Sequence, residues 1–451
     1  MPRRSEPPTV DGSPAKRAEP AQRESSPWPL KSLIPLGLRT AGVLLRALLE
    51  RSTGFHLIHG AHLFLWRLFS ISSLLLKRSN ANARQGVLVV CPPGGGNIGD
   101  QALVESAAWN LEGPVTLAVR SESNYAIPQW LVGKKITTVP LVDLVYGVGF
   151  KHLRDVIRFF ATAQRVISVV IIGADIMDGN YKTIASINRW SLAVLASRCG
   201  ARVSVIGFSW NATPSESSKA GLLEAGKSAY LWVRDPTSLR RVEEAGALNA
   251  RLCADIVFAH PAADGDLGLD KIPDDIAAQV RAYPEYVILN ASGYIGDDQT
   301  VHSEYRSIVK MCQDAGVGVV LLPHVMRGSS DFDCLRRLRD ACDGQLILVD
   351  RLLTPAQVTR LASEAKLVVT GRMHLAVLAS MAGTPVLTLA TQGKVDGLYD
   401  LLGRPDWVLD GHTDFSTTVN RAFAESNESG FDFPGDDALS RIRKLSRLPF
   451  N

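Results

Sequence analysis

The sequence predicts an α/β protein in which two doubly wound parallel sheets face a common cleft. Runs of Val, Ile and Leu alternate with segments of helical character from Gly86 to Leu402, which is typical of parallel sheets covered by helices on both faces. A segment rich in Asp and Gly, Asp264–Asp275, divides this region into two series of similar length. Polar or Gly-rich turns follow several of the expected strands, where such sheets bind ligands.

The apolar runs predict the strands, and the segments between them predict the helices. In the first series we expect strands at Gly86–Cys91, Val115–Val119, Val166–Ile172, Val203–Ile206 and Tyr230–Val233, and helices at Gly99–Leu111, Thr183–Cys199 and Ser238–Ala245. In the second we expect strands at Tyr286–Leu289, Val317–Leu322, Leu346–Val349, Leu367–Val369 and Val386–Leu389, and helices at Ser303–Ala315, Phe332–Cys342, Pro355–Ala365, Leu375–Ala382 and Gly393–Leu402. The expected domains span residues 86–265 and 280–430, and a C-terminal helix follows at residues 431–451.

The first 85 residues differ from the rest in composition and charge. Residues 1–30 contain seven prolines and few large apolar residues, which predicts a disordered tail. Residues 31–85 carry eight Lys or Arg but a single acidic residue, Glu50, although the net charge of the whole chain is only +4. Residues 86–451 are therefore mildly acidic, which is not the distribution of a protein that wraps nucleic acid.

Residues 31–85 predict a basic extension with two apolar helices, the second of them at Phe55–Leu76. The longest stretch without Lys, Arg, Asp or Glu is Ser52–Trp66, which is shorter than the about 20 residues of a membrane span. We therefore expect no transmembrane helix. Basic helices with Trp and Phe suit an anionic membrane surface, but helices that pack on a protein core share this periodicity, so both interpretations stay open.

The six cysteines are scattered, with neither a CxxC pair nor a Cys/His pattern of metal-ligand spacing. Most lie in apolar runs, where a free cysteine acts as a small hydrophobic residue. We therefore expect a reducing, cytoplasmic compartment and no dedicated metal site.

The Gly-rich segment Pro92–Leu103 follows the first expected strand directly. Its three consecutive glycines allow a sharp turn and a close approach of the backbone to a ligand. Asn97 and Asp100 flank the start of the next helix. The segment matches neither GxGxxG nor the phosphate loop GxxxxGK[ST]. Asp100 could equally serve only as a helix N-cap, so this segment alone leaves ligand binding open.

The segment Thr370–Leu389 places Arg372 and His374 at a turn between a strand and a helix. Such a turn presents free backbone N–H groups and the positive end of the helix dipole, and it therefore attracts anions. Arg372 is a permanent cation with several donors, whereas His374 can give or take a proton near neutral pH.

Other strand ends carry polar residues as well. Asp175 could hydrogen-bond sugar hydroxyls or cap a helix, and Arg234 could bind an anion or pair with its neighbours. The residues that follow strands in the second series are Ser292, His324, Arg372, His374 and Lys394. A single histidine is more often structural, but several cationic or titratable groups at successive strand ends predict an anion-binding site. No GxSxG elbow and no clustered carboxylates for Mg²⁺ accompany them.

Together these motifs resemble those of the polysaccharide pyruvyltransferase family. GNIGDQAL at residues 96–103 is similar to the N-terminal signature of that family, and GRMHLAVLASMAGTPV at residues 371–386 is similar to its C-terminal signature. Val233-Arg234-Asp235 with Ser238, and the run Ala254–Val257, also fit, so the resemblance covers about residues 86–409. The family usually carries a Gly-Gly-Gly-Asp/Glu turn where this chain has Gly173-Ala174-Asp175.

The resemblance implies a GT-B-like fold of two Rossmann-like domains, with the acceptor on the N-terminal side and the donor on the C-terminal side. It implies transfer of the pyruvyl group of phosphoenolpyruvate to a saccharide, often lipid-linked, as a ketal with release of phosphate. No metal or other cofactor is implied. The basic extension at residues 31–85 would then hold the enzyme at an anionic membrane, at the inner face of the plasma membrane.

The resemblance also assigns roles to residues. His374 would be the general acid that protonates the methylene carbon of phosphoenolpyruvate, and Asp100 or Asn97 would orient or deprotonate the attacking hydroxyl. The donor-binding residues would be Arg372, Lys394, Arg234 and His324, because a trianionic donor needs several cations or hydrogen-bond donors. The acceptor-binding residues would be Asn97, Asp175 and Ser292.

Two other functions fit the same residues. A GT-B glycosyltransferase that uses a nucleotide sugar would also place a His and an Arg or Lys in the cleft. A membrane-associated saccharide-binding protein would keep the fold without catalysis, although His374, Arg372 and Lys394 argue against it. An NAD-linked oxidoreductase is disfavoured because the Gly pattern is wrong. The acceptor sugar and the oligomeric state stay open.

Overall fold

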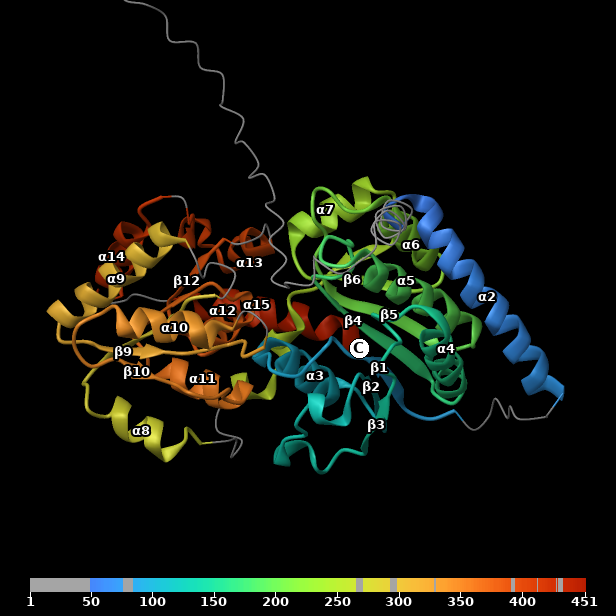
Figure 1. Cartoon of the computed structure of the whole chain (residues 1–451), viewed down its shortest axis with the longest axis horizontal. Coiled ribbons are helices and arrows are strands. Elements are labelled where there is room, and N and C mark those ends of the chain that lie inside the picture. Colours follow the sequence, from blue (N-terminus) through green and yellow to red (C-terminus); the bar gives the residue numbers. More distant parts are fainter. Residues whose placement is uncertain are drawn as a thin grey trace, which may run out of the picture. The chain divides into compact units, whose positions relative to one another are not determined.

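The computed structural model describes residues 49–75, 84–264, 271–292, 298–327, 330–390, 394–411, 413–426, 428 and 433–451. The tail expected at residues 1–30 and the first helix expected in the basic extension therefore lie outside the described residues. The part that the structure describes belongs to one compact unit, Ala47–Asn451 (Figure 1).

The N-terminal half is built on a seven-stranded parallel sheet of order β3-β2-β1-β4-β5-β6-β7. Its strands are β1 (Val87–Val90), β2 (Val115–Val119), β3 (Ile136–Pro140), β4 (Ser168–Ala174), β5 (Arg202–Phe208), β6 (Tyr230–Val233) and β7 (Ala250–Leu252). In the register of the central strands, Val89 lies opposite Leu117 on one side and Val170 on the other. β1 and β4 are buried along their whole length, because helices cover both faces.

Alternation along β1 divides the first domain's core into two clusters. Val87 and Val89 join the buried cluster that contains α3 (Ile98–Asn110), whereas Leu88 and Val90 join the cluster on the opposite face. The helices that accompany this second cluster are α2 (Ser52–Leu75), α4 (Gly149–Ala163), α5 (Thr183–Arg198), α6 (Glu216–Gly226) and α7 (Pro236–Glu244).

The helix expected at Phe55–Leu76 is α2, and it packs along the outer side of α4, α5 and α6 (Figure 1). Phe55 is fully buried, and His59 and His62 both contact the hydroxyl of Ser191 on α5, at 2.9 and 2.8 Å. One face of α2 therefore rests on the protein core. None of the described helices is long and apolar enough to cross a membrane.

The C-terminal half is built on a six-stranded parallel sheet of order β10-β9-β8-β11-β12-β13. Its strands are β8 (Tyr286–Asn290), β9 (Gly318–Leu321), β10 (Ile347–Leu348), β11 (Leu367–Thr370), β12 (Val386–Leu389) and β13 (Val408–Leu409). The helices are α8 (Asp274–Val280), α9 (Gln299–Asp314), α10 (Asp331–Asp340), α11 (Pro355–Ser363), α12 (Met373–Met381), α13 (Lys394–Leu402), α14 (Phe415–Glu425) and α15 (Asp436–Arg447). The prediction of two doubly wound parallel sheets is thus confirmed.

Every strand and helix expected from Gly86 onward is present, with ends that shift by a few residues. The sequence did not predict β3, β7 and β13, and the structure explains why. No residue of β3 is fully buried, so its apolar pattern is weak. β7 and β13 contain three and two residues, which is too short for a periodic signal.

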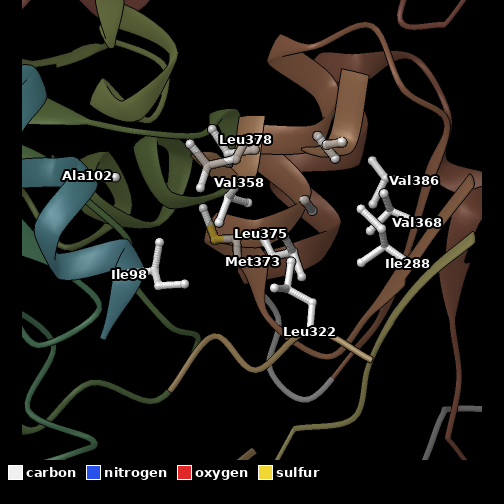
Figure 2. Close-up of a cluster of buried hydrophobic side chains, with 14 of the residues drawn as sticks. Ile98, Ala102, Ile288, Leu322, Val358, Val368, Met373, Leu375, Leu378 and Val386 are labelled. Carbon is white, nitrogen blue, oxygen red and sulfur yellow. The ribbon is translucent and has the colours of Figure 1, made fainter. Parts of the chain in front are cut away.

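The two halves share one hydrophobic cluster. Ile98 and Ala102 of α3 lie beside Met373 of α12 (Figure 2), and the 3₁₀ turn η4 (Ile256–Ala259) joins the same cluster. α3 and α12 each begin at the carboxyl end of a central strand, β1 and β11. Their buried contact therefore brings the two predicted motifs close together.

Candidate active site

A cavity of about 320 Å³ lies at the carboxyl ends of β1, β4, β6, β9 and β11. β1 and β4 flank the point where the strand order of the first sheet reverses, and β11 flanks the corresponding point of the second. Doubly wound sheets bind ligands at this point. The walls include seven predicted site residues, namely Asn97, Asp100, Asp175, Arg234, His324, Arg372 and His374.

Two predicted site residues do not lie on these walls. Ser292 follows β8, but it is 0% exposed and does not line the cavity, so it offers no surface to an acceptor. This placement departs from the predicted acceptor contact. Lys394 begins α13, and its side chain lies outside the described part of the structure. The next residue, Val395, does line the cavity.

The Gly-rich loop owes its shape to backbone angles that glycine alone adopts freely. Gly94, Gly95 and Gly96 have φ values of 61°, 59° and 77°. The loop brings the N–H of Gly94 to Asp100, which accepts its hydrogen bond at 3.1 Å. Asn97, not Asp100, is the N-cap of α3, because its side chain accepts a hydrogen bond from the backbone N–H of Gly99 in the first turn. Asp100 is thereby free to face the cavity.

Arg327, which is not among the predicted site residues, joins the loops of the two halves. It comes from the connection between β9 and α10; its guanidinium donates to the carbonyl of Gly94 and lies 3.3 Å from Asp100 Oδ2. Two backbone hydrogen bonds, of 3.1 and 2.9 Å, tie the same connection to the Gly-rich loop. The sequence feature that could have identified Arg327 is its position as a cation three residues after His324, at the end of a strand.

Asp100 is a buried carboxyl whose surroundings favour proton uptake. Burial raises its pKa, and the positive charge of Arg327 and the nearby His374 offset only part of that rise. A carboxylate with a raised pKa can accept a proton nearer neutral pH, which suits a general base.

His374 is the point at which the two motifs touch. It lies in the first turn of α12, two residues after Arg372, the N-cap. A Cβ atom added at Gly99 would overlap the His374 ring, so the glycine of GNIGDQAL makes room for the histidine of GRMHLAV. On its other side, His374 Nε2 lies 3.5 Å from Asp255 Oδ2.

Asp255 is a buried anion shared by His374 and Arg234. Arg234 Nη1 lies 3.2 Å from Asp255 Oδ2, and both side chains are 1% exposed. Burial alone would raise the pKa of Asp255, but the adjacent His374 and Arg234 outweigh it and lower the pKa to about 2. Asp255 is therefore a fixed negative charge beside His374 at neutral pH. The run Ala254–Val257 fits the family, but the sequence did not predict this role, because Asp255 is distant in the chain from His374.

Arg372 is held in place by Asp331, the first residue of α10. Its Nε and Nη2 donate to Asp331 at 2.6–3.2 Å in a two-pronged ion pair. Asp331 also accepts the backbone N–H groups of His324 and Val325, at 3.1 and 3.0 Å. This one carboxylate thus fixes a cation and a loop that both line the cavity.

Several donors at this wall have no protein partner. Among the described residues, Arg234 Nη2 and both ring nitrogens of His324 are buried without a hydrogen-bond acceptor or donor. Buried polar groups nearly always have partners, so these atoms indicate a binding site for an anionic ligand. Burial lowers the pKa of His324 to about 3, so His324 is neutral at pH 7 and offers one N–H.

The turn after β4 is strained. Ala174 has a φ of 49° and is the only non-glycine with positive φ in the described part of the chain. A left-handed conformation costs an L-residue about 1–2 kcal/mol. Ala174, Asp175 and Ile176 all line the cavity, so the strain lies at the site itself. Asp175 does not cap α5, whose N-cap residue is Lys182.

The arrangement supports a defined chemistry. Arg234, Arg372 and His324 on the cavity wall could bind an anion, His374 could carry a proton, and Asp100 could act as a base. In the portion of the chain that the structure covers, no group of three or more His, Cys, Asp or Glu could hold a metal ion.

The sequence model of one known family matches the chain. It is the polysaccharide pyruvyl transferase family, and the match covers residues 97–393. This range contains the C-terminal signature, all of the N-terminal signature except Gly96, and most of both sheets. A comparison with curated proteins finds no match.

Several solved structures share the fold. UDP-GlcNAc 2-epimerase from Methanocaldococcus jannaschii has a TM-score of 0.51 and 11% identity, over 81% of this chain and 99% of that chain. The S. aureus MnaA–UDP complex has a TM-score of 0.50 and 10% identity, over 79% of this chain and 95% of that chain. Another UDP-N-acetylglucosamine 2-epimerase has a TM-score of 0.51 and 12% identity, over 82% and 92%. These similarities confirm the GT-B-like fold.

Proposed function

Because the chain belongs to the polysaccharide pyruvyl transferase family, we propose that it transfers the pyruvyl group of phosphoenolpyruvate to a saccharide, forming a ketal and releasing phosphate. One observation carries the proposal. The two signatures meet in one cavity, where Gly99 packs against His374 next to unpartnered donors of Arg234 and His324.

The donor would bind to the cationic wall. Phosphoenolpyruvate carries a phosphate and a carboxylate, which need several donors in a partly desolvated site. Arg234 and Arg372 supply permanent charges that Asp255 and Asp331 hold in place, and neutral His324 adds an N–H. Lys394, at the start of α13, would add a third cation.

His374 would deliver the proton that activates the donor. Transfer of its proton to the methylene carbon makes a methyl group and leaves the carbon that bears phosphate electrophilic. The negative charge of Asp255 stabilises the positive charge that His374 carries before this transfer. Asp255 is thus a positioning residue, and His374 is the catalytic acid.

Asp100 would accept the proton of the first attacking hydroxyl. That hydroxyl forms a C–O bond to the electrophilic carbon. A second hydroxyl of the same acceptor then forms the other C–O bond while the bond to phosphate breaks, and the proton of this second hydroxyl leaves on the phosphate. The raised pKa of Asp100 suits it to this base role. Asn97 and Asp175, on the same side of the cavity, would contact the acceptor.

The proposed acceptor is a lipid-linked saccharide, and the proposed location is the cytoplasm, at the inner face of the plasma membrane. The basic composition of residues 31–85 supports this part of the proposal, because such segments are attracted to anionic lipids.

Phosphate release tests the activity. Purified protein is mixed with phosphoenolpyruvate and a panel of lipid-linked and free galactosides, glucosides and mannosides. We expect acceptor-dependent phosphate release that His374→Ala abolishes and that His56→Ala, at an exposed histidine of α2, leaves intact. Release that His374→Ala preserves would contradict the assigned role of His374.

A nucleotide-sugar glycosyltransferase is the second candidate, because UDP-GlcNAc 2-epimerases share the fold. Thermal denaturation separates the two. Phosphoenolpyruvate should raise the melting temperature, whereas a UDP-sugar should not. The reverse result would favour the glycosyltransferase.

A further inference from the structure

α2 is an apolar helix that is covered on only one side. Arg67 is the sole Lys, Arg, Asp or Glu among its 24 residues. A helix that is apolar all round is normally buried. Yet the side that faces away from the core carries large exposed residues, between 51% and 62% accessible, which we call the α2 stripe: Leu57, Phe64, Leu68 and Ile71. Their spacing of seven, four and three places them on one face.

α4 lies beside α2 over more than two turns. His62 Nε2 and His152 Nε2 are 2.7 Å apart, and further along the rings of Phe69 and Phe160 have centroids 5.8 Å apart. Figure 1 shows the two helices on the same side of the first sheet, with α5 between the sheet and α2. The surface of α4 is therefore adjacent to that of α2.

The start of α4 carries the apolar surface toward the cavity. Val148 and Phe150 are 66% and 93% exposed, and they lie just before His152, which contacts α2. Tyr146, only two residues before Val148, lines the cavity. Large exposed apolar residues thus lie both on α2 and at the start of α4, close in the chain to Tyr146 of the cavity wall.

The polar residues exposed on α4 are basic. Lys151, Arg154 and Arg158 are all exposed. The single acid of the helix, Asp155, is buried and pairs with both arginines, at 3.2 and 3.7 Å. The surface of α2 and α4 therefore combines large apolar side chains with an excess of positive charge.

We propose that the α2 stripe, Phe150 and the basic face of α4 dock the enzyme on an anionic lipid bilayer. Apolar side chains of such a surface enter the boundary between headgroups and acyl chains, and the cations meet anionic headgroups. The cavity wall at Tyr146 would then lie next to the membrane. This orientation would bring the cavity close to the proposed lipid-linked acceptor and in that respect rests on the proposed function. The docking itself does not depend on the pyruvyltransferase activity.

The charges favour a bilayer over a second copy of the chain. A dimer through the α2 stripe would be isologous, so each cation of one copy would approach the same cations of the other. Like charges across an interface are unfavourable, whereas an anionic bilayer complements them. The described part of α2 and α4 offers no exposed acidic residue to offset this repulsion.

Vesicle cosedimentation tests the proposal on the full chain. Phosphatidylcholine vesicles with phosphatidylserine should bind the protein, and vesicles of phosphatidylcholine alone should bind it less. Phe64→Glu/Leu68→Glu should weaken binding about a hundredfold, because two apolar side chains no longer insert. The matched control is Val132→Glu/Leu248→Glu, at sites 71% and 82% exposed outside α2 and α4, and it should bind as the wild type does.

A charge series adds a second readout. Lys151→Ala should weaken binding about fivefold, whereas Lys135→Ala, an exposed lysine near β3, should not. All these substitutions are at exposed positions, and thermal denaturation checks that each variant folds.

Equal binding of the stripe variant and its control would overturn the proposal. Failure of the wild-type protein to bind anionic vesicles would also overturn it. A dimer in size-exclusion chromatography that is absent for the stripe variant would show that a second copy of the chain, and not a bilayer, covers the α2 stripe. Phosphate release from a water-soluble acceptor, which should be the same in the wild type and the stripe variant, keeps this result separate from the proposed activity. Its absence in both would count against the pyruvyltransferase chemistry alone.

Discussion

Gly99→Ala sets two physical effects against each other at the point where the signatures touch. Gly99 lies in the first turn of α3, and an alanine inside a helix is favoured over glycine by about 1 kcal/mol. The new Cβ, however, would overlap the ring of His374 and approach its Cβ atom as well. Because the contact reaches the base of the side chain, a rotation of the ring does not relieve it.

We therefore expect a net loss of stability and a larger loss of turnover. Overpacking of this kind costs about 1–3 kcal/mol, which exceeds the gain in helix propensity. Displacement of His374 moves its proton away from the donor, and a misplacement of about 1 Å costs roughly a hundredfold in rate. The cationic wall is untouched, so phosphoenolpyruvate should still raise the melting temperature.

The assays are urea denaturation and phosphate release, with two controls. Gly60→Ala, in α2, meets no atom within 4 Å of the new Cβ and should stabilise the protein by about 0.5–1 kcal/mol. In a His374→Ala background, Gly99→Ala should lose part of its destabilising effect, because the two closest atoms, both in the ring, are gone and only the contact with the β carbon at 2.9 Å remains. Wild-type turnover of Gly99→Ala, or equal destabilisation in both backgrounds, would refute the packing argument.

Three further predictions concern buried charge, strain and pH. Asp255→Asn should lower the free energy of unfolding by about 3 kcal/mol, because Arg234 keeps a buried charge without its partner; denaturant unfolding checks this, and an unchanged midpoint would contradict it. Ala174→Gly should stabilise the protein by about 1 kcal/mol, since glycine removes the left-handed strain at a smaller cost in unfolded-state entropy; a loss of stability would show that the turn is not strained. Burial lowers the pKa of His59 to about 4 and that of His62 to about 3. The contribution of the two neutral histidines to the free energy of unfolding is therefore fully present above their unfolded pKa of 6.5, and it is lost as the pH falls toward their folded pKa values. At about pH 5 the loss should be roughly 2 kcal/mol for each histidine, with α2 losing hydrogen-exchange protection first, and equal protection of α2 at pH 5 and 7 would argue against it.

The N-terminal extension shows how a prediction from sequence differs from what the tertiary structure reveals. The sequence predicted a helix near Phe55–Leu76 and left open whether it meets a membrane or the core. The structure packs one face of α2 on the core and leaves Leu57 and Phe64 exposed on the other. Periodicity could not decide this, because both faces of α2 are apolar and only the position of its neighbours tells them apart.

The sequence by itself determined the two sheets, the family and seven residues of the cavity wall. This was possible because buried parallel strands are continuous apolar runs and because ligands bind where such strands end. Asn97 and Asp100 show the limit, since the sequence placed both at the helix start but could not tell which one caps it.

Only the tertiary structure shows which charged side chains pair with one another around the cavity. Arg327 reaches Asp100 across the two halves, Asp255 lies beside His374, and Asp331 holds Arg372. Each pair joins segments that are far apart in the chain, so its formation depends on the strand order and on how α3 and α12 pack. Local sequence patterns do not encode either of these.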